Sequence, residues 1–231
     1  MRMVKKIVAG IAVLLVAAAA LLFLSYDRII VAILEKSYNL DIRYVKCSKD
    51  FSGKLNFKDL SVVSKPAGRG IISRTAELRP SFLNKRFVVA FNFQDVSFKK
   101  EAVNKPEKYD TLAALLSTPF SSDWRYRPIR GVAEPTAKSI KIKEFEAVSD
   151  DLKLSLTGEL FYTGGIDFDI VIGFAPSLTA KIPPEFANTI LDPDKDGWKS
   201  LSARISGDPN KPSIQVSSRL FRLKINALSG T

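Results

Sequence analysis

The chain has 231 residues, of which 46% are apolar, and it carries a formal net charge of +11 with no histidine. This length suits one domain or two small ones, and the apolar content argues against global disorder. The lack of histidine excludes Ser-His-Asp and Cys-His catalysis and most zinc sites. Because Cys47 is the only cysteine, no internal disulfide can form, and we interpret it as a small strand residue rather than a lipidated or reactive one.

The first residues have the pattern of a membrane anchor. Three basic residues, at positions 2, 5 and 6, precede an uncharged run from Ile7 to Tyr26. A helix of about 20 residues spans about 30 Å, the thickness of the hydrocarbon core of a bilayer. A cleaved signal peptide is the alternative, but its apolar region is usually about 7–15 residues long. We therefore predict a cytoplasmic stub and transmembrane signal anchor over residues 1–26.

This anchor determines where the rest of the chain is expected. Basic residues on the N-terminal side place that end in the cytoplasm, and no second apolar run of comparable length follows. The sequence thus predicts a single-pass protein of the bacterial inner membrane with its bulk in the periplasm. The exported part stays strongly basic, which suits anionic lipid headgroups or an acidic protein partner, although basic charge can also serve solubility alone.

Beyond the anchor, the apolar pattern changes from helical spacing to alternation. Residues 27–40 have apolar side chains at helical spacing and predict a juxtamembrane helix. From residue 41 the apolar residues mostly recur with period two, beginning with 42–47, which predicts strands. In two stretches the alternation changes phase, once between Phe57 and Leu60 and once at Asp95. Such a change usually marks a β-bulge or the end of a strand.

The middle of the chain departs from this alternation. Residues 106–120 have leucines at helical spacing and predict a helix that ends near Pro119. Residues 121–131 predict a loop in which aromatic and basic side chains interleave. These side chains are Trp124, Arg125, Tyr126, Arg127 and Arg130. Such a mixture can bind nucleic acid, but none is expected outside the cytoplasm. We therefore consider a membrane-interface or partner-binding loop, with a purely structural loop as the alternative.

Strands resume after residue 136. The stretches 137–148, 151–161 and 164–174 alternate, and the sequence Thr-Gly-Gly at 163–165 predicts a hairpin between the last two. A short helix is expected over 183–191, which begins with two prolines. Two strands then flank a turn near residue 209, and residues 219–225 predict a further strand or an amphipathic end.

The fold class that follows is mainly β and antiparallel, with a few short helices after the N-terminal transmembrane helix. Strands with one strongly apolar face need something to cover that face. A closed barrel, a sandwich and an open apolar groove all satisfy the pattern. From alternation alone, a closed core is favoured over an open groove.

The stretch "LDPDKDGW" at 191–198 resembles the start of a calcium loop. With Asp192 as the first ligand, the twelfth position should hold a bidentate Glu, but it holds Ala203. The residues that follow alternate like a strand rather than continue as a helix. We therefore predict a polar turn from which Trp198 packs back on the core, and no metal site or cofactor.

Catalytic motifs are also missing. The paired carboxylates at 150–151 and at 167 and 169 have no visible partner for acid–base work, and no nucleotide-binding or nucleophile motif occurs. The sequence therefore predicts a protein that is not an enzyme.

Three stretches resemble the AsmA-like family, the AsmA/TamB-type membrane-anchored periplasmic proteins with short relatives such as type II secretion system protein N. The first is the anchor followed by residues 32–64, in which "G-x-L-x-F-x-D-L-x-V" begins at Gly53 and ends at Val62. The second is the hairpin 75–98, which ends in "D-V-S-F". The third is the strand–turn–strand pattern "LSARISGDPNKPSIQV". The present chain is far shorter than most family members.

The resemblance implies an elongated, curved β-sheet over residues 41–231 whose concave apolar face binds lipid. The residues that would line this face are Phe87, Val89, Phe91, Phe93, Leu152, Leu154, Leu156, Ile166, Phe168, Ile170 and Ile172. The expected partners are the inner membrane, phospholipid or another envelope lipid, and envelope-assembly or secretion proteins, with no nucleic acid. The alternative function is a structural subunit or scaffold of a secretion or pilus apparatus.

Overall fold

A computed structural model describes residues 28, 31–32, 35–36, 39–50, 52–65, 68, 70–83, 86–99, 115–116, 118–120, 123–208, 211–220 and 222–226, with only the backbone of 120, 211, 225 and 226. These residues form one large, open antiparallel sheet with the short α-helices α3 and α4, and further helical positions lie between 28 and 36 and at 115–116. The mainly β, antiparallel class expected from the alternation is confirmed, and the sheet neither closes into a barrel nor divides into two.

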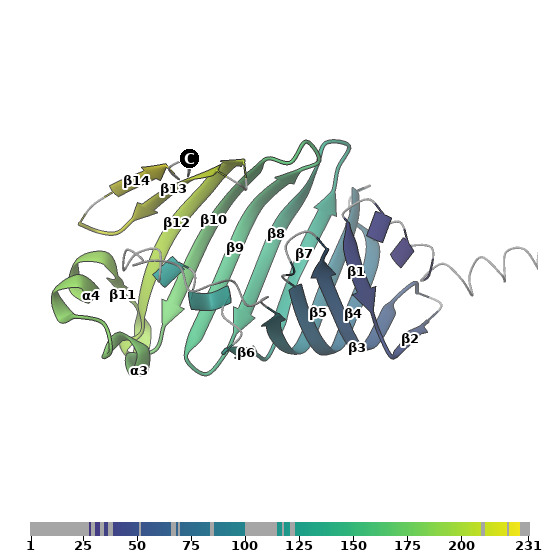
Figure 1. The fold of residues 1–231 in the computed structure, drawn as a ribbon, viewed down its shortest axis with the longest axis horizontal. Coiled ribbons are helices and arrows are strands. Elements are labelled where there is room, and N and C mark those ends of the chain that lie inside the picture. The colour runs from purple at the N-terminus through teal and green to yellow at the C-terminus, as the bar shows by residue number, and fades with distance from the viewer. Residues whose placement is uncertain are drawn as a thin grey trace, which may run out of the picture.

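The sheet follows the chain order almost throughout (Figure 1). Its main path runs β1-β3-β4-β5-β7-β8-β9-β10-β12-β13-β14, while β2 pairs with β3, β6 with β5 and β11 with β12. The strands are β1 (Leu40–Arg43), β2 (Lys46–Lys49), β3 (Leu55–Ser64), β4 (Gly70–Leu83), β5 (Arg86–Lys99), β6 (Arg125–Tyr126), β7 (Ile129–Pro135), β8 (Ser139–Val148), β9 (Leu152–Phe161), β10 (Ile166–Phe174), β11 (Asp192–Pro193), β12 (Lys199–Asp208), β13 (Lys211–Ser217) and β14 (Arg222–Asn226).

The residues before the sheet include the predicted juxtamembrane helix. Its described positions between 28 and 36 are helical. The backbone N–H of Ile42 donates to the Glu35 carboxylate at 3.0 Å, which joins this helix to β1. The predicted anchor, 1–26, lies outside the described residues. Among the residues that are described, no helix is long and apolar enough to cross a bilayer.

A crease crosses the first strands of the sheet. In β3 the side chains that face the core are at odd positions up to Phe57 and at even positions from Leu60. The same change of parity occurs in β5 between Phe93 and Val96. Asp59 and Asp95 stand at these points with φ of 52°, a conformation that aspartate tolerates better than most residues. Figure 1 shows that β3, β4 and β5 are strongly curved.

The crease corrects the expectation of a bulge or a strand end at these positions. Lys58 pairs with Thr75 and Leu60 pairs with Ser73, so β3 and β4 keep one register on both sides of the crease. β5 also continues through it. The strands therefore bend together without an extra residue in either one. Bulges do occur farther along, between β7 and β8 and between β8 and β9.

The same line continues into the neighbouring chain segments. β1 and β2 pair with β3 in a single register that is interrupted at residues 44–45, so the strand expected over 42–47 is divided there. On the other side, β6 and β7 flank the Arg127–Pro128 step in one register with β5. The Asp95 carboxylate contacts Arg74 at 3.3 Å and Arg127 at 2.8 Å, which links β4, β5 and the bend between β6 and β7 along the crease.

The later elements agree with the sequence. β9 and β10 form the predicted hairpin, in which the Phe161 N–H donates to the Gly165 carbonyl at 2.8 Å. α4 (Pro184–Ile190) begins at the expected prolines, and β12, β13 and β14 follow as strands. α3 (Pro176–Thr179) was not predicted. Of the helix expected over 106–120, only Leu115 and Leu116 are described as α-helical, and Thr118–Phe120 forms a 3-10 turn.

Candidate functional site: a half-covered apolar face

One face of the sheet, here called the inner face, collects the apolar positions of successive strands. Cross-strand pairing carries a row from Leu154 through Ile172 to Leu201, and a parallel row from Phe168 through Ile205 to Ile214. The row through Phe93, Ile129, Ala147 and Leu154 joins β5 to this face. All predicted lining residues therefore lie on the inner face. They are Phe87, Val89, Phe91, Phe93, Leu152, Leu154, Leu156, Ile166, Phe168, Ile170 and Ile172.

One end of the inner face is a closed core. Leu152, Leu154, Ile172 and Phe174 are at most 1% exposed. They belong to a cluster that also holds residues of α4 and Leu115, with side chains of α3 packed against it. Figure 1 shows α3 and α4 gathered at this end of the strands. These predicted lining residues are thus covered by other parts of the same chain.

The other end of the inner face is only partly covered. Ile140, Leu160 and Ile166 pair in register across β8, β9 and β10, and all three are half-buried. We call these three residues the rim row. Val89, Phe91, Leu156 and Phe168 are also half-buried, and Phe87 is 39% exposed. The inner face therefore grades from a dry core to an accessible apolar surface along its strands.

Two glycines shape this surface, and the sequence reasoning missed both. A β-carbon on Gly131 would lie 2.6 Å from Cζ of Phe91, and one on Gly158 would lie 2.8 Å from Cδ1 of Phe168. Each aromatic ring therefore rests on the backbone of the neighbouring strand, where any other residue would displace it. Glycine within an alternating strand is the signal that could have indicated such a close approach.

The opposite, outer face is polar and bears cross-strand ion pairs. Arg204 makes two hydrogen bonds to Asp167, at 2.8 and 2.9 Å, and Arg130 makes two to Glu146, at 2.7 and 2.8 Å. The pairing with Asp167 raises the pKa of Arg204. Asp167, one of the paired carboxylates considered for catalysis, is thus engaged in a structural ion pair.

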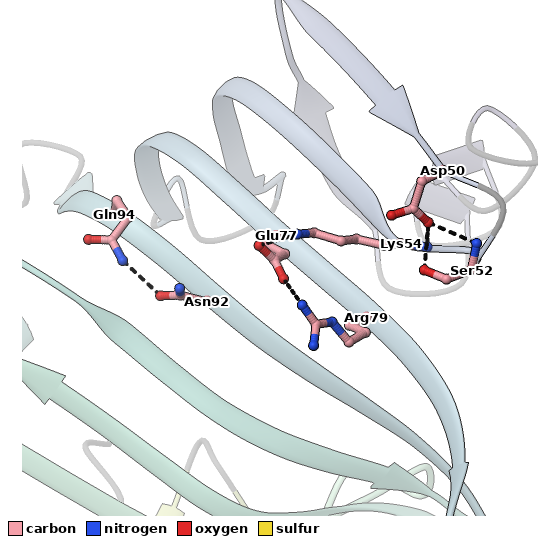
Figure 2. A network of polar contacts seen from close by, with 7 residues as sticks. All are labelled: Asp50, Ser52, Lys54, Glu77, Arg79, Asn92 and Gln94. Carbon is pink, nitrogen blue, oxygen red and sulfur yellow. Dashed lines mark hydrogen bonds and ion pairs between the residues drawn. The ribbon is translucent and has the colours of Figure 1, made fainter.

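A polar network lies at the start of the outer face (Figure 2). Glu77 accepts from Lys54 at 2.8 Å and from Arg79 at 3.0 Å, and the hydrogen bond and charge of Lys54 hold its pKa below the ordinary value. Beside it, Gln94 donates to Asn92 at 2.9 Å, and the Asp50 carboxylate accepts from the hydroxyl and backbone of Ser52. The ion pair between Lys54 and Glu77 links the start of β3 to β4.

This network predicts a dependence of stability on pH. Because the folded-state pKa of Glu77 lies below its unfolded value of about 4.3, its ion pairs stabilise the fold above that pH, and the contribution is lost as pH falls through the folded pKa. We expect Glu77→Gln to lower the unfolding free energy by roughly 1 kcal/mol or less at pH 7. The difference from the parent should begin to shrink as pH falls below about 4.3 and should vanish only below the folded-state pKa of Glu77.

Thermal unfolding followed by circular dichroism at pH 7 and pH 3.5 measures this difference. Glu144→Gln, at an exposed carboxylate outside these ion pairs, is the matched control and should change little at either pH. A Glu77→Gln deficit of the same size at both pH values would contradict the assignment.

Of the five residues expected in a basic aromatic loop, Arg125, Tyr126 and Arg130 lie in strands and Trp124 packs against the core, which corrects the loop; only Arg127 lies in the short bend between β6 and β7. Tyr126, in β6, is fully buried, and its hydroxyl donates to the Pro119 carbonyl at 2.7 Å. Burial raises its pKa. Trp124 packs on the core, Arg127 and Arg130 are ion-paired, and only Arg125 is exposed without an ion pair among the described residues. A membrane or partner contact by these residues stays a prediction.

The aspartates at 192–196 form a polar turn, as expected. Asp192 accepts from the backbone of Arg219 at 2.8 Å and Asp194 from that of Lys195 at 2.7 Å. In the part of the chain that the structure describes, no group of His, Cys, Asp and Glu is placed to hold a metal ion. Trp198 departs from the prediction, because it lies on the outer face with the Lys153 ammonium 4.1 Å from its ring centroid.

Comparison of the chain with family models, with curated proteins and with solved structures finds no match in any of the three.

Proposed function

We propose that this protein binds the acyl chains of lipid on the half-covered part of its inner face. The observation that carries the proposal is the gradient of burial along one continuous apolar face. Ile172 is 1% exposed at the core end, whereas the rim row is half-buried and Phe87 is 39% exposed. A protein core needs no such accessible extension, but an acyl chain needs an apolar surface that it can reach.

The chemistry of the inner face suits a hydrocarbon ligand. Across β7 to β10 the inward positions carry no charged side chain, since they hold only glycine, proline, alanine and larger apolar residues. Removing apolar surface from water gains about 25 cal/mol per Å². An acyl chain lying on the rim row would gain this energy on both surfaces without leaving a polar group unsatisfied.

The predicted anchor would place this surface beside a membrane. We propose that residues 1–26 hold the protein in the bacterial inner membrane and that the sheet lies in the periplasm. The resemblance to AsmA-like proteins supports a role in binding or handing on envelope lipid. The anchor would supply lipid at high local concentration, because it keeps the sheet beside a bilayer.

A second candidate function rests on the closed end of the inner face. There the α-helices and Leu115 seal the apolar side chains completely, as a scaffold would require. If the half-covered end is sealed by another protein, the chain is a structural subunit of a larger envelope or secretion apparatus.

Site-specific photo-crosslinking tests the two candidates. A benzophenone amino acid replaces Leu160, in the rim row, and in a separate variant replaces Val171, which is exposed on the outer face of the neighbouring strand. The full chain is irradiated in membranes, purified and weighed intact. We expect a mass increase of one phospholipid at position 160 and none at position 171.

Benzophenone at Leu14, within the predicted anchor, shows that lipid adducts can be detected. A lipid adduct at Leu14 without one at Leu160 would contradict lipid binding on the inner face. A protein adduct at Leu160 in its place would support the scaffold.

A further inference from the structure

The hairpin between β4 and β5 extends beyond the strands on either side of it. β4 and β5 have 14 residues each, which makes them the longest strands described. β3 pairs with β4 only as far as Leu78, and β7 pairs with β5 only as far as Val89. Past these points the two strands pair only with each other, to Leu83 and Arg86. We call residues 79–83 and 86–88 the β4–β5 ribbon.

The end of this ribbon is apolar and exposed. Phe82 is 79% exposed, Leu83 63% and Phe87 39%. The rings of Phe82 and Phe87 contact each other, with centroids 5.5 Å apart, beside a hollow of about 590 Å³ that Pro80 and Arg79 also line. A two-stranded ribbon is marginally stable in water, and grouped exposed apolar side chains of this kind mark an interaction site.

The exposed rings continue the inner face. Phe82 and Phe87 pair with each other, followed inward by Pro80 with Val89, Leu78 with Phe91 and Ala76 with Phe93. Exposure falls along β4 from 79% at Phe82 to 1% at Ala76. An apolar track therefore runs without interruption from the ribbon end to the core.

The ribbon is flanked by clusters with an excess of positive charge. On one side Lys54 and Arg79 share Glu77, and on the other Arg86 and Lys143 share Glu134, at 3.5 and 3.1 Å. Each cluster holds two cations and one carboxylate, so each keeps one net positive charge. Apolar side chains flanked by basic ones suit a bilayer with anionic headgroups.

We propose that the β4–β5 ribbon is a second membrane contact, which inserts Phe82 and Phe87 into an anionic bilayer surface and joins the inner face to the lipid phase. The inference rests on the proposed function, because it assigns the place where an acyl chain passes from the bilayer to the inner face. The predicted anchor makes the contact effectively intramolecular, so a few apolar side chains suffice.

Depth-dependent fluorescence quenching on the full chain tests this inference. Leu83→Cys, in a Cys47→Ala background, is labelled with an environment-sensitive fluorophore and reconstituted into vesicles of phosphatidylcholine and phosphatidylglycerol. Nitroxide-labelled lipid reports insertion, and aqueous iodide reports exposure. Val171→Cys on the outer face is the matched labelling site. We expect nitroxide lipid to reduce the emission at position 83 about twofold, with little effect at 171 and the reverse ranking for iodide.

Removing the aromatic rings tests the cause. Phe82→Ser with Phe87→Ser should return the label at 83 to iodide, whereas Leu220→Ser, at an exposed leucine near the other end of the sheet, should not. Equal iodide quenching at 83 and 171 in the parent would overturn the inference, and so would protection from both quenchers, which would indicate a protein on the ribbon.

The outcome is separable from that of the proposed function. A lipid adduct at Leu160 together with a water-exposed label at position 83 leaves lipid binding intact and removes the ribbon contact. An inserted label without a lipid adduct at Leu160 supports the membrane contact and removes lipid binding on the inner face.

Discussion

Truncating Phe174 to alanine is expected to lower the free energy of unfolding by about 3–5 kcal/mol. The ring is 1% exposed and lies in the closed end of the inner face, opposite Leu152 on β9. Neighbouring elements cannot collapse into the space, because α4 and the sheet both pack around it. Urea unfolding of the full chain in detergent, followed by near-ultraviolet circular dichroism, measures the loss.

Leu160→Ala is the matched variant at the half-covered end. It removes a side chain of similar character from a site that is already reached by solvent, so we expect a loss of about 1 kcal/mol or less. The pair separates residues that hold the fold together from residues that are free to serve a ligand. Equal losses at positions 160 and 174 would contradict the gradient of burial.

Replacing Gly158 with alanine should cost about 3 kcal/mol. The φ of Gly158 is 144°, which other residues rarely adopt, and a β-carbon there would lie 2.1 Å from the Asp167 carbonyl oxygen. Both the backbone strain and the displacement of β10 contribute. Because the ring of Phe168 rests on this glycine, near-ultraviolet circular dichroism of the folded variant should also change.

Gly164→Ala is the control for backbone strain alone. Gly164 has a φ of 95° in the β9–β10 turn, but no atom lies within 4 Å of a β-carbon placed there. We expect a loss of about 1 kcal/mol, measured by the same urea unfolding. If Gly158→Ala and Gly164→Ala lower the free energy of unfolding by the same amount, the close approach of Phe168 to Gly158 does not contribute to stability.

The inner face could be predicted because alternation is a property of single strands. Phe91 and Ile170 could each be assigned to an apolar face from their own stretch of sequence, and pairing then placed both on one side of the sheet. What covers that face could not be predicted. Whether Leu154 is sealed and Leu160 is not depends on α3, α4 and Leu115, which approach from elsewhere in the chain.

Two errors have local physical causes. The residues around Tyr126 alternate aromatic and basic side chains, which is a strand pattern with one buried face, but composition favoured a loop. Trp198 was expected on the core because of its size. It instead covers Gly173 on the outer face and stacks with Lys153, a contact that depends on the pairing of β9 with β10.

Because of the crease, the numbers of residues in chain segments that are far apart in sequence depend on one another. The segments from β1 to β7 reverse their inward side at one line while their registers stay unbroken. A single-residue deletion beside Asp59 or Asp95 would move every later side chain of that strand to the opposite face of the sheet. Apolar side chains would then face solvent, while the neighbouring strands kept their orientation. Insertions and deletions in this half of the protein are therefore tolerable only in the turns. The strands of the bent sheet must keep their lengths together during evolution.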